Sequence, residues 1–199
     1  MPLEPIVELQ SQRLKLRPVA ERDLQDLLEI NGDPEVTRFL PYPAWQSLDD
    51  GAGWLERMDA LAATGTGQQL VLARKADSKV VGTLLLFRFD EPSGRVELGF
   101  VLGRPWWRQG LMAEAVEAVC AHVFSAMSLR RVEAEVNPAN AASNQLLKRA
   151  GFTHEGTLRK RWVAKGEAHD THFYGCLADD WLRARAAGRA PASPRSRWR

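Results

Sequence analysis

The chain has 199 residues, 45% hydrophobic and 26% charged, with a net charge of +2, so its composition favours one ordinary globular domain without a strong excess of either charge. No apolar run approaches the roughly 18 residues of a membrane span, and the opening MPLEPIVELQ lacks the basic and apolar segments of a signal peptide. Cys120 and Cys176 lie among apolar residues, so we expect buried free thiols and a cytoplasmic location.

The first third of the chain predicts one strand followed by helices. Residues 13–17 alternate leucine with basic residues, as an edge strand does, and Pro18 ends the strand. Leucines at helical spacing predict a helix over residues 21–30. Ser47 is a favourable N-cap for a further helix that runs to about Ala63.

Three strands are expected next. Residues 69–74 and 79–89 are two apolar runs joined by a short polar turn. Residues 95–102 then alternate apolar and other side chains with the period of a strand. Gly99 inside this third run suggests a β-bulge or the close approach of another backbone.

A glycine-bearing turn and a long helix follow. The apolar residues between Met112 and Met127 recur at helical spacing, so the turn leads into the start of a helix. Backbone N–H groups there lack partners, Gly110 lets an anion come close, and Arg104 and Arg108 add positive charge. We interpret the turn as a pyrophosphate cradle. It is neither a GxGxxG fingerprint nor a P-loop, and an ordinary strand–turn–helix corner is the alternative.

The remaining elements complete an α/β pattern. Residues 131–136 predict a short strand, and the helix after it ends at Gly151, which is placed as a left-handed C-cap. Residues 152–163 and 169–177 predict a closing hairpin. The order indicates a mixed α/β sheet with helices on both faces. The fourth and fifth predicted strands, joined by the long helix, should lie parallel with a right-handed crossover.

The C-terminal segment differs in composition from the rest of the chain. Residues 183–199 contain six arginines and no acidic residue, which leaves a net charge of −4 on the remainder. We therefore divide the chain into a domain over residues 1–180 and a basic, flexible tail over residues 181–199. The segment from Ala178 to Arg199 is expected to fray after one helical turn. The tail is interpreted either as a solvated end or as an RNA contact.

Two segments together resemble a known family. Residues 97–115, ELGFVLGRPWWRQGLMAEA, are similar to the acetyl-CoA pyrophosphate motif of the GNAT N-acetyltransferase superfamily. Residues 137–159, NPANAASNQLLKRAGFTHEGTLR, resemble the asparagine–serine helix of its ribosomal-protein alanine N-acetyltransferase branch. The resemblance implies a mostly antiparallel sheet of seven strands, in which parallel strands 4 and 5 splay apart.

The same resemblance implies an activity. The protein would use acetyl-CoA as cosubstrate, without a metal, to acetylate a primary amine by direct attack in a ternary complex. The acceptor would be a ribosomal or other protein N-terminus or a small amine, and a homodimer is possible. The alternative is an RNA- or ribosome-binding module on a degenerate transferase fold, acting through the arginine tail.

The resemblance also assigns cofactor contacts. The backbone N–H groups that would bind the pyrophosphate belong to Arg108, Gln109, Gly110, Leu111 and Met112. The residues that would pair with the pantetheine arm, like an added strand, are Phe100, Val101 and Leu102. Asn140 would contact the pantetheine amides, or it is simply a helix cap. Trp107 and Met112 depart from the usual motif, and Met112 is bulkier than the residue usually found there.

Two residues are assigned to the chemistry. Ser143 stands where much of the superfamily has a tyrosine acid, so it would assist the departing thiolate through a hydrogen bond or a water relay, unless it is an inert first-turn residue. Glu97 is the candidate base for the acceptor ammonium, and a surface strand carboxylate is the alternative. A backbone N–H near Phe100 or Val101 would stabilise the oxyanion.

Overall fold

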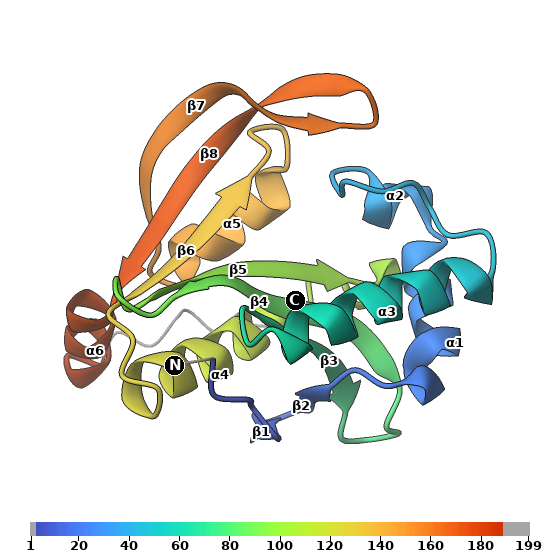
Figure 1. Cartoon of the computed structure of the whole chain (residues 1–199). Helices are drawn as coiled ribbons and strands as arrows, with labels where there is room; N and C mark the ends of the chain where they lie inside the picture. Colours follow the sequence, from blue (N-terminus) through green and yellow to red (C-terminus); the bar gives the residue numbers. More distant parts are fainter. Residues whose placement is uncertain (1–2, 189–199) are drawn as a thin grey trace, which may run out of the picture.

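The computed structural model describes residues 3–188, in which eight strands form one sheet in the order β1-β2-β3-β4-β5-β6-β8-β7 (Figure 1). The strands are β1 Leu9–Gln10, β2 Leu14–Pro18, β3 Gln68–Arg74, β4 Val80–Asp90, β5 Arg95–Leu102, β6 Arg131–Val136, β7 Thr153–Ala164 and β8 Glu167–Leu177. The α-helices are α1 Leu24–Asn31, α2 Pro34–Thr37, α3 Leu48–Ala63, α4 Leu111–Ser125, α5 Ala141–Arg149 and α6 Ala178–Ala186. Short 3₁₀ turns occupy Glu21–Asp23 and Arg104–Trp106.

The predicted mixed sheet is confirmed, with one correction to the strand count. Neighbouring strands are antiparallel except β5 and β6, which are parallel and joined by α4, as expected. The sheet has eight strands in the described residues instead of seven, because β1 pairs with β2 over Leu9 and Gln10. Two residues are too few for an alternating pattern to identify a strand.

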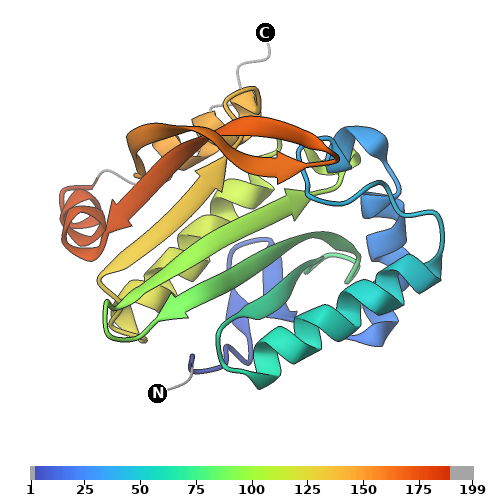
Figure 2. The same ribbon diagram turned by 45° about the horizontal axis from the view of Figure 1, so that its top comes forward.

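Helices cover the two faces of the sheet unequally (Figure 2). On one face, Val116 and Val119 of α4 share a core with Val96 of β5 and Val132 of β6, and α5 and α6 extend the same core. On the other face, α1 and α3 pack against β3 and β4. The side of β5 and β6 that carries Glu97 therefore points away from α4, because successive strand residues alternate between faces.

Strands β5 and β6 separate after a short parallel contact. Arg95–Glu97 pair with Arg131–Glu133, and beyond Glu97 β5 continues with β4 whereas β6 continues with β8. Figure 1 shows the two strands diverging from this point. We call this opening the split. It confirms the expected splay of the parallel pair.

The irregularity that Gly99 suggested lies elsewhere in the structure. Gly99 pairs regularly with Leu85, and an added Cβ would lie 3.6 Å from the ring of Phe87, an ordinary contact distance. The register shift occurs in β4, between Phe87 and Asp90, where Arg88 has a φ of 52°. A glycine in one strand does not reveal which strand of a pair carries the extra residue.

Helix α6 is longer than the single turn expected for the C-terminal segment. It spans Ala178–Ala186, and Trp181 is buried with its ring centroid 5.6 Å from that of Phe124. Arg185 forms an ion pair with Glu117 of α4. The expected division at residue 180 thus falls inside a helix, and the basic residues from 189 onwards lie outside the described part. Within residues 3–188, no helix is both long and apolar enough to cross a membrane.

Candidate active site

The start of α4 presents a row of unpartnered backbone donors. Gly110 is the N-cap with a φ of 76°, and Arg108 has a φ of 60°. The first hydrogen bond of the helix runs from the N–H of Glu114 to the carbonyl of Gly110 at 3.0 Å. In the described chain, no N–H from Arg108 to Ala113 donates to a protein acceptor. These donors and the positive end of the helix dipole make the turn suitable for an anion.

The side chains around this turn leave the donors accessible. Leu111 and Met112 are buried in the core, so the bulk of Met112 points away from the turn. Gln109 is held by its own side chain, whose Nε2 donates to the carbonyl of Pro105 at 2.8 Å. Arg108 is exposed and has no ion-pair partner among the described residues, which leaves its guanidinium free for an anion.

Arg104, the second arginine of the turn, is ion-paired within the protein. Arg104 Nε lies 2.6 Å from Asp33 Oδ2, and so Arg104 links the turn to the start of α2.

The carboxylate of Glu114, in the first turn of α4, is also compensated, because Ser11 and Arg13 donate to it. Burial alone would raise the pKa of Glu114, but these hydrogen bonds bring the pKa below its ordinary value. A negative charge in the first turn of α4 is therefore compensated within the protein.

The backbone groups of β5 alternate between the two sides of the strand. The N–H of Gly103 donates to the carbonyl of Val81 in β4 at 2.9 Å. Antiparallel pairing continues with a two-residue period, so the backbone groups of Val101 point towards β4. Those of Phe100 and Leu102 point into the split, where β6 supplies no ladder partner. The pantetheine contacts predicted for Phe100 and Leu102 are thus open, whereas Val101 offers no free backbone group.

Trp107 already uses one of the groups in the split. Its Nε1 donates to the carbonyl of Leu102 at 2.6 Å, and the side chain is otherwise exposed. Within residues 3–188, Phe100 is therefore the residue of β5 whose N–H and carbonyl both face the split without a partner. Its N–H is the candidate oxyanion donor that this geometry favours.

Asn140 and Ser143 lie at the start of α5, the helix that follows β6 in the chain. Asn140 is the N-cap, and its Oδ1 accepts from the N–H of Ser143 at 3.1 Å. The capping interpretation of Asn140 is confirmed, while its Nδ2 has no acceptor in the described chain. The hydroxyl of Ser143 is partly exposed and also has no protein partner there.

A buried amide that the sequence analysis did not identify anchors this helix. Asn144 Oδ1 accepts from Tyr174 Oη at 2.7 Å and lies 2.8 Å from His172 Nδ1, both on β8. Its Nδ2 donates to the carbonyl of Asn140 at 2.7 Å. Burial lowers the pKa of His172, and the charges of His154 and Lys148 add to this effect. In the sequence, this role could have been suspected because Asn144 directly follows Ser143, the candidate acid, in the predicted helix.

Glu97 lies at the point where β5 and β6 separate, and it is buried. Its Oε2 accepts from Arg88 Nη1 at 2.7 Å, and the same nitrogen donates to Glu135 Oε1 at 3.0 Å. Burial raises the pKa of Glu97, and this effect outweighs the opposing effect of Arg88. The charges of Glu135 and Glu133 raise the pKa further. The predicted base is therefore a desolvated carboxylate inside an ion-pair cluster, not a surface residue.

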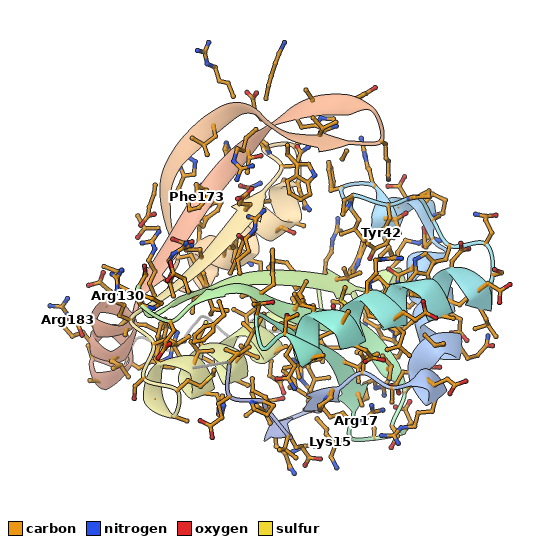
Figure 3. All side chains as sticks on the ribbon, in the orientation of Figure 1. Lys15, Arg17, Tyr42, Arg130, Phe173 and Arg183 are labelled. Carbon is orange, nitrogen blue, oxygen red and sulfur yellow. The ribbon has the colours of Figure 1, made fainter. Side chains whose placement is uncertain are left out.

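The rest of this cluster balances its charge. Arg95 donates to Glu133 at 2.8 Å, and Arg131 bridges Glu133 and Glu155. The acids of β6 were detectable in the sequence, because R-V-E-A-E-V alternates apolar and charged residues. Figure 3 shows Phe173 on β8 and Tyr42 in the loop after α2, on either side of the diverging ends of β5 and β6.

Comparison with known proteins gives consistent matches. A model of the acetyltransferase (GNAT) domain matches residues 13–153. An N-acetyltransferase named p20 from Bacillus licheniformis is 30% identical over 173 residues, which are 87% of this chain and 97% of that protein. The [ribosomal protein uS5]-alanine N-acetyltransferase of Escherichia coli is 26% identical, over 91% of this chain and 96% of that enzyme. The structure of Mycobacterium smegmatis RimJ in complex with CoA-disulfide superimposes with a TM-score of 0.78 at 22% identity, covering 92% and 95% of the two chains.

Proposed function

This chain belongs to the GNAT acetyltransferase family, and we propose that it moves the acetyl group of acetyl-CoA to a primary amine by direct attack in a ternary complex. The membership makes it an acyltransferase of the N-acetyltransferase class. The single observation that carries the proposal is the row of free N–H groups from Arg108 to Ala113 beside the split. A diphosphate at that row would direct the attached chain into the split.

The pyrophosphate and the pantetheine arm of the cofactor each have suitable partners. The pyrophosphate would bind the N–H groups of Arg108 to Met112, with the Arg108 side chain supplying charge. The pantetheine amides would pair with the carbonyl of Phe100 and the N–H of Leu102, which remain open on β5, and with the free Nδ2 of Asn140. We do not expect a metal in this reaction, because acyl transfer from a thioester needs only a nucleophile, proton transfer and oxyanion stabilisation.

The chemistry follows from these positions. Glu97 takes a proton from the acceptor ammonium, and the neutral amine attacks the thioester carbonyl carbon. The N–H of Phe100 hydrogen-bonds the oxyanion. The C–S bond then breaks as the carbonyl re-forms. The attacking nitrogen gives up its second proton, and the Ser143 hydroxyl or a water that it holds passes this proton to the departing sulfur. The products are an amide and free CoA.

The acceptor is proposed only as a class. The relatives include an enzyme named for alanine acetylation of ribosomal protein uS5, and this supports a protein N-terminus as one acceptor. A small amine fits the same chemistry, because both acceptors arrive as ammonium ions. We also propose a cytoplasmic enzyme, in agreement with buried, unpaired Cys120 and Cys176, and a homodimer that light scattering would test.

The test is calorimetric binding of acetyl-CoA, followed by CoA release with a panel of N-terminal peptides, polyamines and aminoglycosides. We expect micromolar binding and transfer to at least one acceptor. Absence of binding at high micromolar acetyl-CoA would refute the proposal. Salt-sensitive RNA binding that depends on residues 183–199, without acetyl-CoA binding, would instead support the ribosome-binding alternative.

A further inference from the structure

One buried carboxylate oxygen in the cluster around Glu97 has no hydrogen-bond partner. The Glu135 side chain is 7% exposed, and its Oε1 accepts from Arg88 and lies 3.5 Å from Arg161 Nη2. Its Oε2 is buried and unpartnered in the described structure. A buried oxygen of this kind costs free energy, and it needs an explanation such as a ligand that supplies the missing donor.

Arg88 holds Glu97 and Glu135 together with a single nitrogen atom. Its Nη1 lies 2.7 Å from Glu97 Oε2 and 3.0 Å from Glu135 Oε1, whereas the two glutamate side chains are 6% and 7% exposed. The Arg88 side chain itself is 44% exposed and comes from a bulge with a positive φ. It is thus the outer, replaceable member of a site whose two carboxylates are held by neighbouring strands.

Arg88 Nη1 lies between two residues that border the split. Glu97 is the last residue of β5 paired with β6, and Glu135 lies two residues beyond its partner Glu133 on β6. The two carboxylates therefore flank the place where the sheet opens. Phe100, the proposed oxyanion donor, is three residues further along β5. A nitrogen held between Glu97 and Glu135 would sit near the thioester that the split is proposed to receive.

We infer that Arg88 occupies, in the free protein, the place of the acceptor ammonium between Glu97 and Glu135, and that the acceptor binds by displacing it. This rests on the proposed function and names the acceptor class: an aliphatic amine that arrives as a cation. Its N–H groups supply a donor to each carboxylate, including the free oxygen of Glu135. Glu97 then removes one proton, and the neutral nitrogen attacks the acetyl carbon. Arylamines, which are neutral at pH 7, would be poor acceptors.

Two substitutions should move the pH profile in opposite directions. Glu97 faces Arg88 from β4 and Glu133 and Glu135 from β6. Arg95 and Arg131 pair with Glu133, and Arg161 of β7 reaches Glu135. Removal of the Arg88 charge favours the protonated acid, so Arg88→Met should shift the acid limb of kcat/KM to higher pH. Removal of the Glu135 charge should shift that limb to lower pH in Glu135→Gln.

Steady-state kinetics with an aliphatic acceptor gives the main test. Glu135→Gln should raise the acceptor KM by about tenfold or more, with the KM of acetyl-CoA unchanged. Arg88→Met should lower the acceptor KM at pH values above its acid limb, because a competing cation is gone. The controls are Glu155→Gln, which alters an ion pair of Arg131 without touching Arg88, and Arg183→Met, which removes the exposed partner of Asp180 on α6. Neither control should change the acceptor KM.

The outcomes separate this inference from the proposed function. If the protein transfers acetyl groups but Glu135→Gln matches Glu155→Gln, or if Arg88→Met raises the acceptor KM at every pH, the inference is wrong and the function stands. If acetyl-CoA does not bind, the function is wrong. In that case, calorimetric titration of spermidine still tests whether the carboxylate pair binds a cation. Spermidine binding that Glu135→Gln weakens and Arg88→Met strengthens would support the inference. Equal binding by the two variants and the wild type would refute the inference.

Discussion

At the residue scale, the site depends on a few groups whose environment departs from that of the free amino acid. Glu97 is a carboxylate that burial makes harder to ionise, and Arg88 partly restores its charge. Gly110 adopts a backbone conformation that places the N–H groups of the α4 start in an accessible row. Neither property is visible in the identity of the residue alone, and each leads to a direct prediction.

Glu97→Gln should lower kcat by about 10²- to 10⁴-fold, the usual contribution of a general base. Because the pKa of Glu97 is raised, the wild-type rate should fall as the pH drops through a value above the ordinary carboxyl pKa of about 4.3. This acid limb should disappear in the variant, while calorimetry shows unchanged acetyl-CoA affinity. A pH profile that is identical in both proteins would remove Glu97 from the mechanism.

Gly110→Ala should weaken acetyl-CoA binding by about tenfold, because an L-residue in the left-handed conformation costs roughly 1–2 kcal/mol and the row of donors must rearrange to relieve it. Gly166→Ala is the matched control, since its φ of 81° carries the same strain in the β7–β8 turn and an added Cβ there meets nothing within 4 Å. Calorimetry should show a changed Kd for the first variant alone. Equal Kd values would mean that α4 does not hold the phosphates.

At the element scale, helix α5 is positioned by a buried amide rather than by apolar packing alone. Asn144 joins α5 to β8 through Tyr174 and His172, and it also returns a hydrogen bond to Asn140. The β7–β8 hairpin is tied to α2 in a similar way, because Lys165 Nζ donates to the carbonyl of Thr37 at 2.8 Å. The contacts of Asn144 therefore determine where α5, and with it Ser143, lies against β8.

Asn144→Ala should destabilise the protein by about 2–4 kcal/mol, because it leaves the buried Tyr174 hydroxyl and a backbone carbonyl without partners. Thermal unfolding measures this cost, and kcat should fall together with stability as Ser143 loses its anchor. Gln145→Ala, at the exposed neighbouring position, is the control and should unfold within about 0.5 kcal/mol of the wild type. Similar melting temperatures for the two variants would contradict the anchoring role.

At the scale of the whole molecule, the sheet consists of two parts that share only a short parallel seam. Residues 95–97 and 131–133 form that seam, and helix α4 packs across both parts on one face. The arrangement keeps the fold continuous while it leaves β5 and β6 open to a ligand. The C-terminal helix strengthens the same assembly, because Trp181 packs on α4.

Two truncations test where this assembly ends. A chain that ends at Gly188 should retain the melting temperature and acetyl-CoA affinity of the full protein. A chain that ends at residue 180 lacks the buried Trp181 and should lose about 3–5 kcal/mol, the typical cost of removing a large aromatic side chain. Equal stability of the two truncated chains would mean that the domain ends at residue 180, as the sequence analysis expected.

The sequence by itself determined the order of the strands from β2 onwards, the parallel pair joined by α4, the capped helices and the glycine-bearing turn before α4. These features depend on local periodicity and on glycine and capping residues, which act over a few positions. Only the tertiary structure decided that Arg88 bridges Glu97 and Glu135, that Asn144 holds α5, and that Val101 turns its backbone away from the split. Those results depend on which strands are neighbours and on their register, and contacts between residues tens of positions apart leave no periodic pattern in one chain.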